Sequence, residues 1–105
     1  MNYILNDRGL PVAEPDILKW AAWFETAERH LADDTPAPGV RVSTVFLGID
    51  HNWSRTRGLP LLWETMIFWD GHDLDQEQKR YVSRTDALAG HARMVERVLA
   101  ALRLN

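Results

Sequence analysis

The chain has 105 residues, a length typical of one domain, so we expect residues 1–105 to form a single fold. Hydrophobic residues make up 46% and charged residues 26%, with a net charge of −3, which excludes a disordered chain and a strongly basic nucleic-acid binder. The absence of cysteine excludes disulfide scaffolds, thiol catalysis and cysteine metal sites. Five tryptophans among ten aromatic residues are the unusual feature of the composition.

The first residues lack the basic and apolar regions of a secretory signal, and no apolar run approaches the roughly 18 residues that cross a bilayer. We therefore expect a cytoplasmic protein without a membrane partner. The segments 3–5 and 10–12 flank turn-forming residues and predict a hairpin. Pro15 and Asp16 then open a helix. Its predicted buried arc contains Ile17, Trp20, Ala21, Phe24, Ala27 and Leu31, with Trp23 at the margin.

The segment 33–39 is rich in Asp, Pro and Gly and is interpreted as a connection. Segments 40–50 and 61–69 are apolar on both faces, as central strands are, and a third strand is predicted over 79–82. Ser83 begins a second helix with a capping-box pattern. The prediction is an α+β fold: a mostly antiparallel sheet, formed by the N-terminal hairpin and a three-stranded meander, with two helices in the order ββ-α-βββ-α. Both helices are expected on one face of the sheet.

A meander places the loops 50–59 and 70–77 at opposite ends of the sheet. The first loop is basic and predicts an anion-binding site, because guanidinium groups hold phosphates or carboxylates and an indole ring can stack on a ligand. The residues of this predicted site are His51, Trp53, Arg55 and Arg57. The alternative is a solvated hairpin tip. One strand length, about 30 Å, separates His51 from His72, so we predict no metal site, and we predict no cofactor.

The second loop is acidic, and this composition predicts either a solvated turn or a surface that recognises a basic protein partner. Trp63 and Trp69 share one strand face, which a partner protein or a second copy would cover if the helices lie on the other face. The predicted partner-binding residues are Trp63, Trp69, Asp70, Asp73, Asp75 and Glu77. Direct binding of nucleic acid is not expected. A third hypothesis is that the acidic loop imitates nucleic-acid phosphates toward a basic protein.

Two polar residues interrupt apolar faces. Glu64 lies between Leu62 and Met66 on one strand face, and His91 lies at the centre of the apolar face of the last helix. If Glu64 faces this helix, the two form a buried carboxylate–imidazole pair, which would be a candidate acid–base site. The alternatives are a structural pair or a solvent-facing Glu64. No motif for a nucleophile, a phosphate-binding loop or a zinc protease is present in the sequence.

Residues 42–51 (VSTVFLGIDH), 60–68 (PLLWETMIF), Arg80-Tyr81 and 90–92 (GHA) together resemble a family of small uncharacterised proteins encoded by bacteriophages and prophages. The resemblance covers residues 40–98. Where that family carries a short glycine-rich turn after Asp50-His51, this chain has Trp53 to Arg57. No activity is attached to the family, so the resemblance implies a setting, the cytoplasm of a phage host, rather than a mechanism.

The leading hypothesis is a non-catalytic phage-type interaction protein that binds a host or phage protein and could also form a homodimer. A counter-defence factor, such as an inhibitor of a CRISPR–Cas complex, is one role of this class. The alternative is a small enzyme or anion-binding protein that uses Glu64, His91 and the Asp50–His51 end of the sheet. In that reading, the helix start at Ser83 adds its dipole to the anion site.

Overall fold

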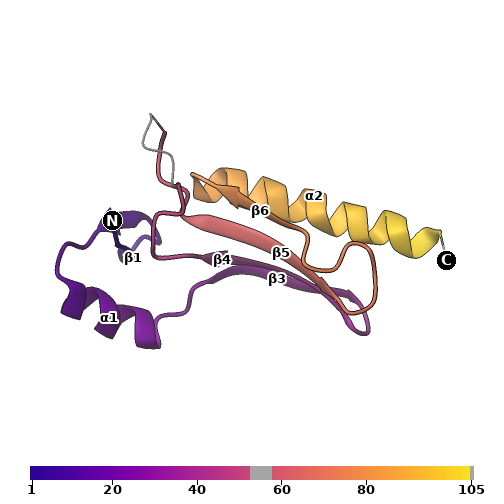
Figure 1. Ribbon diagram of the computed structural model, residues 1–105, viewed down its shortest axis with the longest axis horizontal. Helices are drawn as coiled ribbons and strands as arrows, with labels where there is room; N and C mark the ends of the chain where they lie inside the picture. The colour runs from indigo at the N-terminus through magenta and orange to yellow at the C-terminus, as the bar shows by residue number, and fades with distance from the viewer. Residues whose placement is uncertain (53–57, 105) are drawn as a thin grey trace.

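A computed structural model describes residues 1–52 and 58–104. Within these ranges the elements are β1 (Tyr3–Leu5), β2 (Pro11–Ala13), α1 (Ile17–Thr26), β3 (His30–Ala37), β4 (Val40–Phe46), β5 (Trp63–Trp69), β6 (Gln78–Tyr81) and α2 (Arg84–Arg103). β1 and β2 form a two-stranded hairpin, and β3-β4-β5-β6 form an antiparallel meander (Figure 1). The predicted α+β fold with antiparallel strands is confirmed, although the N-terminal hairpin forms a sheet of its own rather than part of the meander's sheet. The meander has four strands rather than the three predicted.

The additional strand is β3, whose sequence HLADDTPA predicts the end of a helix followed by a connection. α1 instead ends at Thr26, and the chain becomes extended at Ala27. β3 then pairs with β4, with His30 opposite Val45 and Asp34 opposite Val42. Two irregularities in this register and the presence of Pro36 are typical of an edge strand. Pairing with β4 therefore overrides a local sequence that favours a turn.

Of the two described helices, α2 covers the four-stranded sheet and α1 does not, which corrects the expectation of two helices on one face (Figure 1). Ser83 caps α2, because its side chain accepts a hydrogen bond from the Asp86 amide, as the capping pattern predicted. The covered face carries alternate residues of the two central strands: Val40, Val42, Thr44 and Phe46 of β4, and Trp63, Thr65 and Ile67 of β5.

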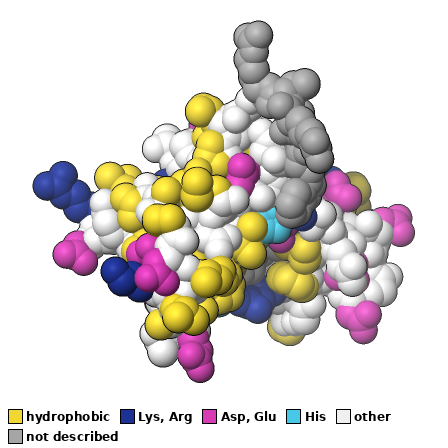
Figure 2. Space-filling view, turned by 60° about the vertical axis from the view of Figure 1, so that its left-hand side comes forward, with side chains coloured by type: hydrophobic (Ala, Val, Ile, Leu, Met, Phe, Trp, Pro, Cys, Tyr) yellow, Lys and Arg dark blue, Asp and Glu magenta, His cyan; other side chains and the backbone are white. Residues whose placement is uncertain are grey.

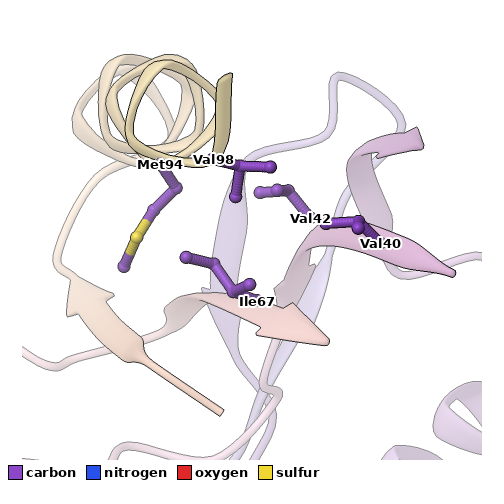
Figure 3. Close-up of a cluster of buried hydrophobic side chains, with 5 residues drawn as sticks. All are labelled: Val40, Val42, Ile67, Met94 and Val98. Atoms are coloured by element: carbon purple, nitrogen blue, oxygen red, sulfur yellow. The ribbon is translucent and has the colours of Figure 1, made fainter. Parts of the chain in front are cut away.

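Two apolar clusters fill the space between α2 and the sheet. One consists of Val40, Val42, Ile67, Met94 and Val98, and Figure 3 shows these side chains meeting between the helix and the strands. The other consists of Phe46, Leu62, Trp63, Tyr81 and Ala87. Along β4 and β5, Thr44 and Thr65 lie between the two clusters and are fully buried. The core therefore has a polar layer between two apolar ones.

α1 lies beyond one end of the sheet, next to β1 (Figure 1). The hairpin and α1 together form what we call the N-terminal lobe, residues 2–26. The Trp20 indole N–H donates to the carbonyl oxygens of Tyr3 and Gly48, at 3.1 and 3.0 Å. The Phe24 ring packs on Gly48, whose φ of +78° favours glycine. These contacts join the lobe to the chain that follows β4.

Candidate functional site

His91 lies at the centre of the polar layer in the core. Its Nδ1 atom is 2.7 Å from the Thr44 hydroxyl, which is 2.6 Å from the hydroxyl of Thr65. Its Nε2 atom is 2.6 Å from a carboxylate oxygen of Asp34. A carboxylate only accepts hydrogen bonds, so Nε2–H donates to Asp34. In the neutral ring, Nδ1 then accepts from Thr44, and Thr44 accepts from Thr65.

An acid, an imidazole and a hydroxyl in a row are the parts of a nucleophilic relay. Here both threonine hydroxyls are fully buried, and the exposed member is the carboxylate of Asp34. A substrate therefore has no route to the hydroxyl that would attack it. The network instead connects α2 to β3, β4 and β5, and each buried polar group within the network has a partner.

Glu64 and His91 do not form the pair that the acid–base hypothesis required. Thr65 faces α2, so its neighbour Glu64 faces the opposite side of the sheet. There the Glu64 carboxylate accepts a hydrogen bond from Arg80 Nε at 2.9 Å. Residues of β5 alternate between the two faces, and the sequence left open which of the two faces carries Glu64.

The acidic loop between β5 and β6 is organised by its own side chains. The Trp69 amide donates to Asp75 at 2.8 Å, and the Leu74 amide donates to His72 Nδ1 at 3.0 Å. The His72 ring stacks on the Trp69 ring, with centroids 3.7 Å apart. Glu77 pairs with Arg97 of α2, whereas Asp70 and Asp73 are exposed. In the described ranges 1–52 and 58–104, no group of three or more acids or histidines could hold a metal ion.

A shallow hollow of about 500 Å³ adjoins this loop. Its lining combines three of the predicted partner-binding residues with the β3–β4 turn and the outer sheet face: Thr35, Gly39, Val40, Arg41, Phe68, Trp69, Asp70 and Asp75. Arg41 binds Asp33 through two hydrogen bonds of 2.8 and 2.7 Å. The hydrogen bonds from Arg41 hold the pKa of the Asp33 carboxyl below its usual value.

The predicted role of Trp63 in a partner surface is contradicted by its position in the structure. Trp63 is only 1% exposed, because α2 covers the face that it shares with Thr65. Its ring lies 5.0 Å from that of Phe46, and its buried indole N–H has no acceptor within the described part of the chain. Trp69 is half-buried against the first apolar cluster. The outward side of β5 instead presents Glu64, Met66 and Phe68.

The predicted anion site falls only partly within the described residues. Trp53, Arg55 and Arg57 lie outside them. Asp50 organises the start of this loop, since its carboxylate accepts from the amides of Asn52 and Leu61 at 2.8 and 2.9 Å. His51 Nδ1 lies 2.7 Å from the Ile49 carbonyl oxygen. The two residues thus have structural contacts at the base of the loop.

The exposed side of α1 corrects the sequence prediction, which placed Ile17 and Ala21 in the buried arc of this helix. Only Lys19, Glu25 and Thr26 of this ten-residue helix are polar. Trp20, Trp23 and Phe24 face the rest of the molecule and are half-buried, and no residue of α1 is fully buried. The opposite side exposes Ile17, Leu18, Ala21 and Ala22, and we call these four residues the α1 surface. The sequence signal for the α1 surface is that apolar residues lie around most of the helix, whereas a helix with one buried stripe has polar residues on its other side.

Comparison of the chain with family models, curated proteins and solved structures returned no match. None of the helices in the described ranges is both long and apolar enough to span a membrane.

Proposed function

We propose that this protein is an interaction module that binds another protein through the α1 surface. The observation that carries the proposal is the exposure of an apolar helix. Ile17 is 58% and Leu18 is 78% exposed, on a helix that is otherwise suited to burial. A helix that is hydrophobic nearly all round is normally covered, and contiguous exposed apolar residues mark interaction surfaces.

The rest of the N-terminal lobe supports the same surface. Leu10 and Val12 of the hairpin are also exposed. In Figure 2, which brings this end of the molecule forward, hydrophobic side chains gather over a broad area, with charged groups among and beside them. Removing such side chains from water contributes about 25 cal/mol per Å² to association. A complex with a partner that has its own apolar surface would therefore be stabilised by contact with the N-terminal lobe.

Charge indicates the kind of partner. Up to residue 29, the chain has five acids and three cations. Asp16 precedes the helix, and Glu25 lies on the helical arc between Ile17 and Leu18. Arg29 is occupied, because it donates to the Phe46 carbonyl oxygen and lies over the Phe24 ring. The occupant that we propose is a protein with an apolar patch bordered by lysine or arginine.

The phage setting implied by the resemblance makes a host or phage protein the proposed partner. Inhibition of a defence complex, such as CRISPR–Cas, is one role that requires no chemistry from this chain. For such inhibition, the chain would need only to cover a functional surface of the defence complex. This role is proposed by analogy with the class of small phage proteins. The proposal of the α1 surface is supported by the exposure of its residues.

A photocrosslinking amino acid at position 18 tests the proposal in the bacterial cell that expresses the protein. The same amino acid at Leu59, which is 68% exposed, provides the matched control. We expect one protein to crosslink from position 18 and not from position 59. That protein is then purified and titrated with the wild-type chain, Leu18→Glu and Leu59→Glu. Leu18→Glu should weaken binding at least about tenfold, the loss of one anchoring side chain, and Leu59→Glu should not.

Two results would overturn the proposal. One is equal affinity of Leu18→Glu and wild type for the purified protein. The other is a dimer in light scattering that Leu18→Glu dissociates, because a second copy would then be the occupant of the α1 surface.

A further inference from the structure

A second site is a small pocket of about 150 Å³ between β6 and α2. It is lined by Lys79, Tyr81, Gly90, Arg93, Met94 and Arg97. Three of these residues are cationic, and none of the described residues that line it is acidic. In a chain with a net charge of −3, such a local excess of positive charge stands out.

Regular periodicity brings the pocket residues together. Gly90, Arg93 and Arg97 are spaced by three and four positions on α2 and therefore share one helical face. Lys79 and Tyr81 are two positions apart on β6 and share the strand face toward α2. The Lys79 ammonium lies 5.9 Å from the centre of the Tyr81 ring. The cations thus come from both walls of the pocket.

Because residue 90 is a glycine, the Tyr81 hydroxyl can approach the helix and form a polar floor for the pocket. A Cβ atom at position 90 would overlap the hydroxyl of Tyr81, so the tyrosine hydroxyl lies directly against the helix backbone. Tyr81 is otherwise buried in the second apolar cluster. A larger residue at position 90 would displace this hydroxyl, which is the one neutral hydrogen-bonding group that the side chains of the lining provide.

Two of the three cations have no acidic partner among the residues that the structure describes. Arg97 donates to Glu77 at 3.2 Å, in a pair that is half-exposed. Within the described residues, Lys79 and Arg93 form no ion pair. The pocket therefore retains positive charge that an anion can neutralise.

We infer that this pocket binds the phosphoryl group of inorganic phosphate or of a phosphate monoester. Two guanidinium groups, one ammonium group and a hydroxyl match the several acceptor oxygens and double charge of a phosphate better than the two oxygens of a carboxylate. Tyr81 and Met94 add an apolar wall, which would contact the organic part of an ester. The site is separate from the α1 surface, so it stands independently of the proposed function.

The test is an NMR titration of the full chain with inorganic phosphate and with phenyl phosphate, at constant ionic strength in chloride. We expect saturable shifts at the Gly90 amide. Arg93→Gln should weaken binding roughly tenfold or more, because it removes a charge-assisted hydrogen bond. Tyr81→Phe should weaken binding about threefold. The control Arg84→Gln removes an exposed cation of α2 outside the pocket and should leave binding unchanged.

The two ligands distinguish the source of the phosphoryl group. Tighter binding of phenyl phosphate indicates an ester that also contacts the apolar wall, and equal binding indicates free phosphate. Lys79→Gln, at an exposed strand position, replaces Tyr81→Phe if that variant does not fold. The inference is overturned if neither ligand gives saturable shifts. It is also overturned if Arg84→Gln weakens binding as much as Arg93→Gln, as a diffuse attraction would.

Discussion

The imidazole of His91 lies 2.7 Å from the hydroxyl of Thr44, in a layer that is closed to solvent on the threonine side. This contact joins α2 to the centre of the sheet. Its partners on either side, Thr65 and Asp34, extend the network across three strands. A polar layer between two apolar clusters selects one register of helix and sheet, because any shift would leave buried groups unpaired.

Thr44→Val should therefore destabilise the fold. The substitution leaves His91 Nδ1 and the Thr65 hydroxyl without their shared partner in a buried layer. We expect a loss of about 1–3 kcal/mol in the free energy of unfolding, measured by urea denaturation. Thr35→Val, on the exposed edge strand, is the matched control and should change stability by less than about 0.5 kcal/mol. Equal effects of the two substitutions would show that the network contributes nothing to stability.

Gly48→Ala tests how the N-terminal lobe is attached. An alanine there would adopt a φ of +78°, and its Cβ would lie 3.0 Å from the Phe24 ring. Gly71 has a φ of +79° with open space around it, so Gly71→Ala has the same backbone strain without the contact. We expect both variants to lose about 1–2 kcal/mol from strain, and Gly48→Ala to lose more.

The additional loss in Gly48→Ala should appear together with a change in the near-ultraviolet circular dichroism, since Trp20 and Phe24 pack at this glycine. If the two variants have the same free energy of unfolding, the Phe24 contact is not what holds the lobe in place.

Gly90→Ala should destabilise the protein, although a helix usually favours alanine over glycine. In an exposed helix interior, alanine is favoured over glycine by about 1 kcal/mol. At position 90 the added methyl group would overlap Tyr81, so we expect the variant to be less stable than wild type. Ala89→Gly, at the exposed neighbouring position, should lose about 1 kcal/mol from propensity alone. A more stable Gly90→Ala in thermal unfolding would contradict the close approach of α2 and β6.

The Asp33–Arg41 pair predicts a small acid-dependent contribution to stability. Because the pKa of Asp33 is lowered in the folded state, chiefly by the hydrogen bonds from Arg41, its contribution is present above the unfolded pKa. The contribution disappears as the pH falls through the lower, folded pKa. Both side chains are more than 40% exposed, so solvent screening keeps this contribution small.

A carboxyl carbon NMR titration measures this shift directly. In Arg41→Gln, the pKa of Asp33 should rise toward its ordinary value, because its main hydrogen-bond donor is absent. An unchanged titration of Asp33 in this variant would assign the shift to another neighbour.

Local patterns in the sequence determined much of the fold. The alternation in 40–50 and 61–69 predicted β4 and β5, which are a few residues shorter, and the Ser83 cap marked the start of α2. These features depend on neighbours within one strand or one helical turn, which the sequence displays directly. For the candidate sites, the sequence singled out His91 as a polar residue at the centre of an apolar helix face. This property follows from its position within one helix.

Tertiary structure alone decided the remaining relationships. β3 is a strand because β4 offers an unpaired edge, although Asp33, Asp34 and Pro36 favour a turn locally. The partners of His91 and Glu64 depend on which face of β5 the helix covers, and an alternating strand that is apolar on both sides does not specify this. The α1 surface is exposed because the Trp20 and Phe24 contacts at Gly48 hold α1 beyond the sheet. Such contacts between distant segments have no local signature in the chain.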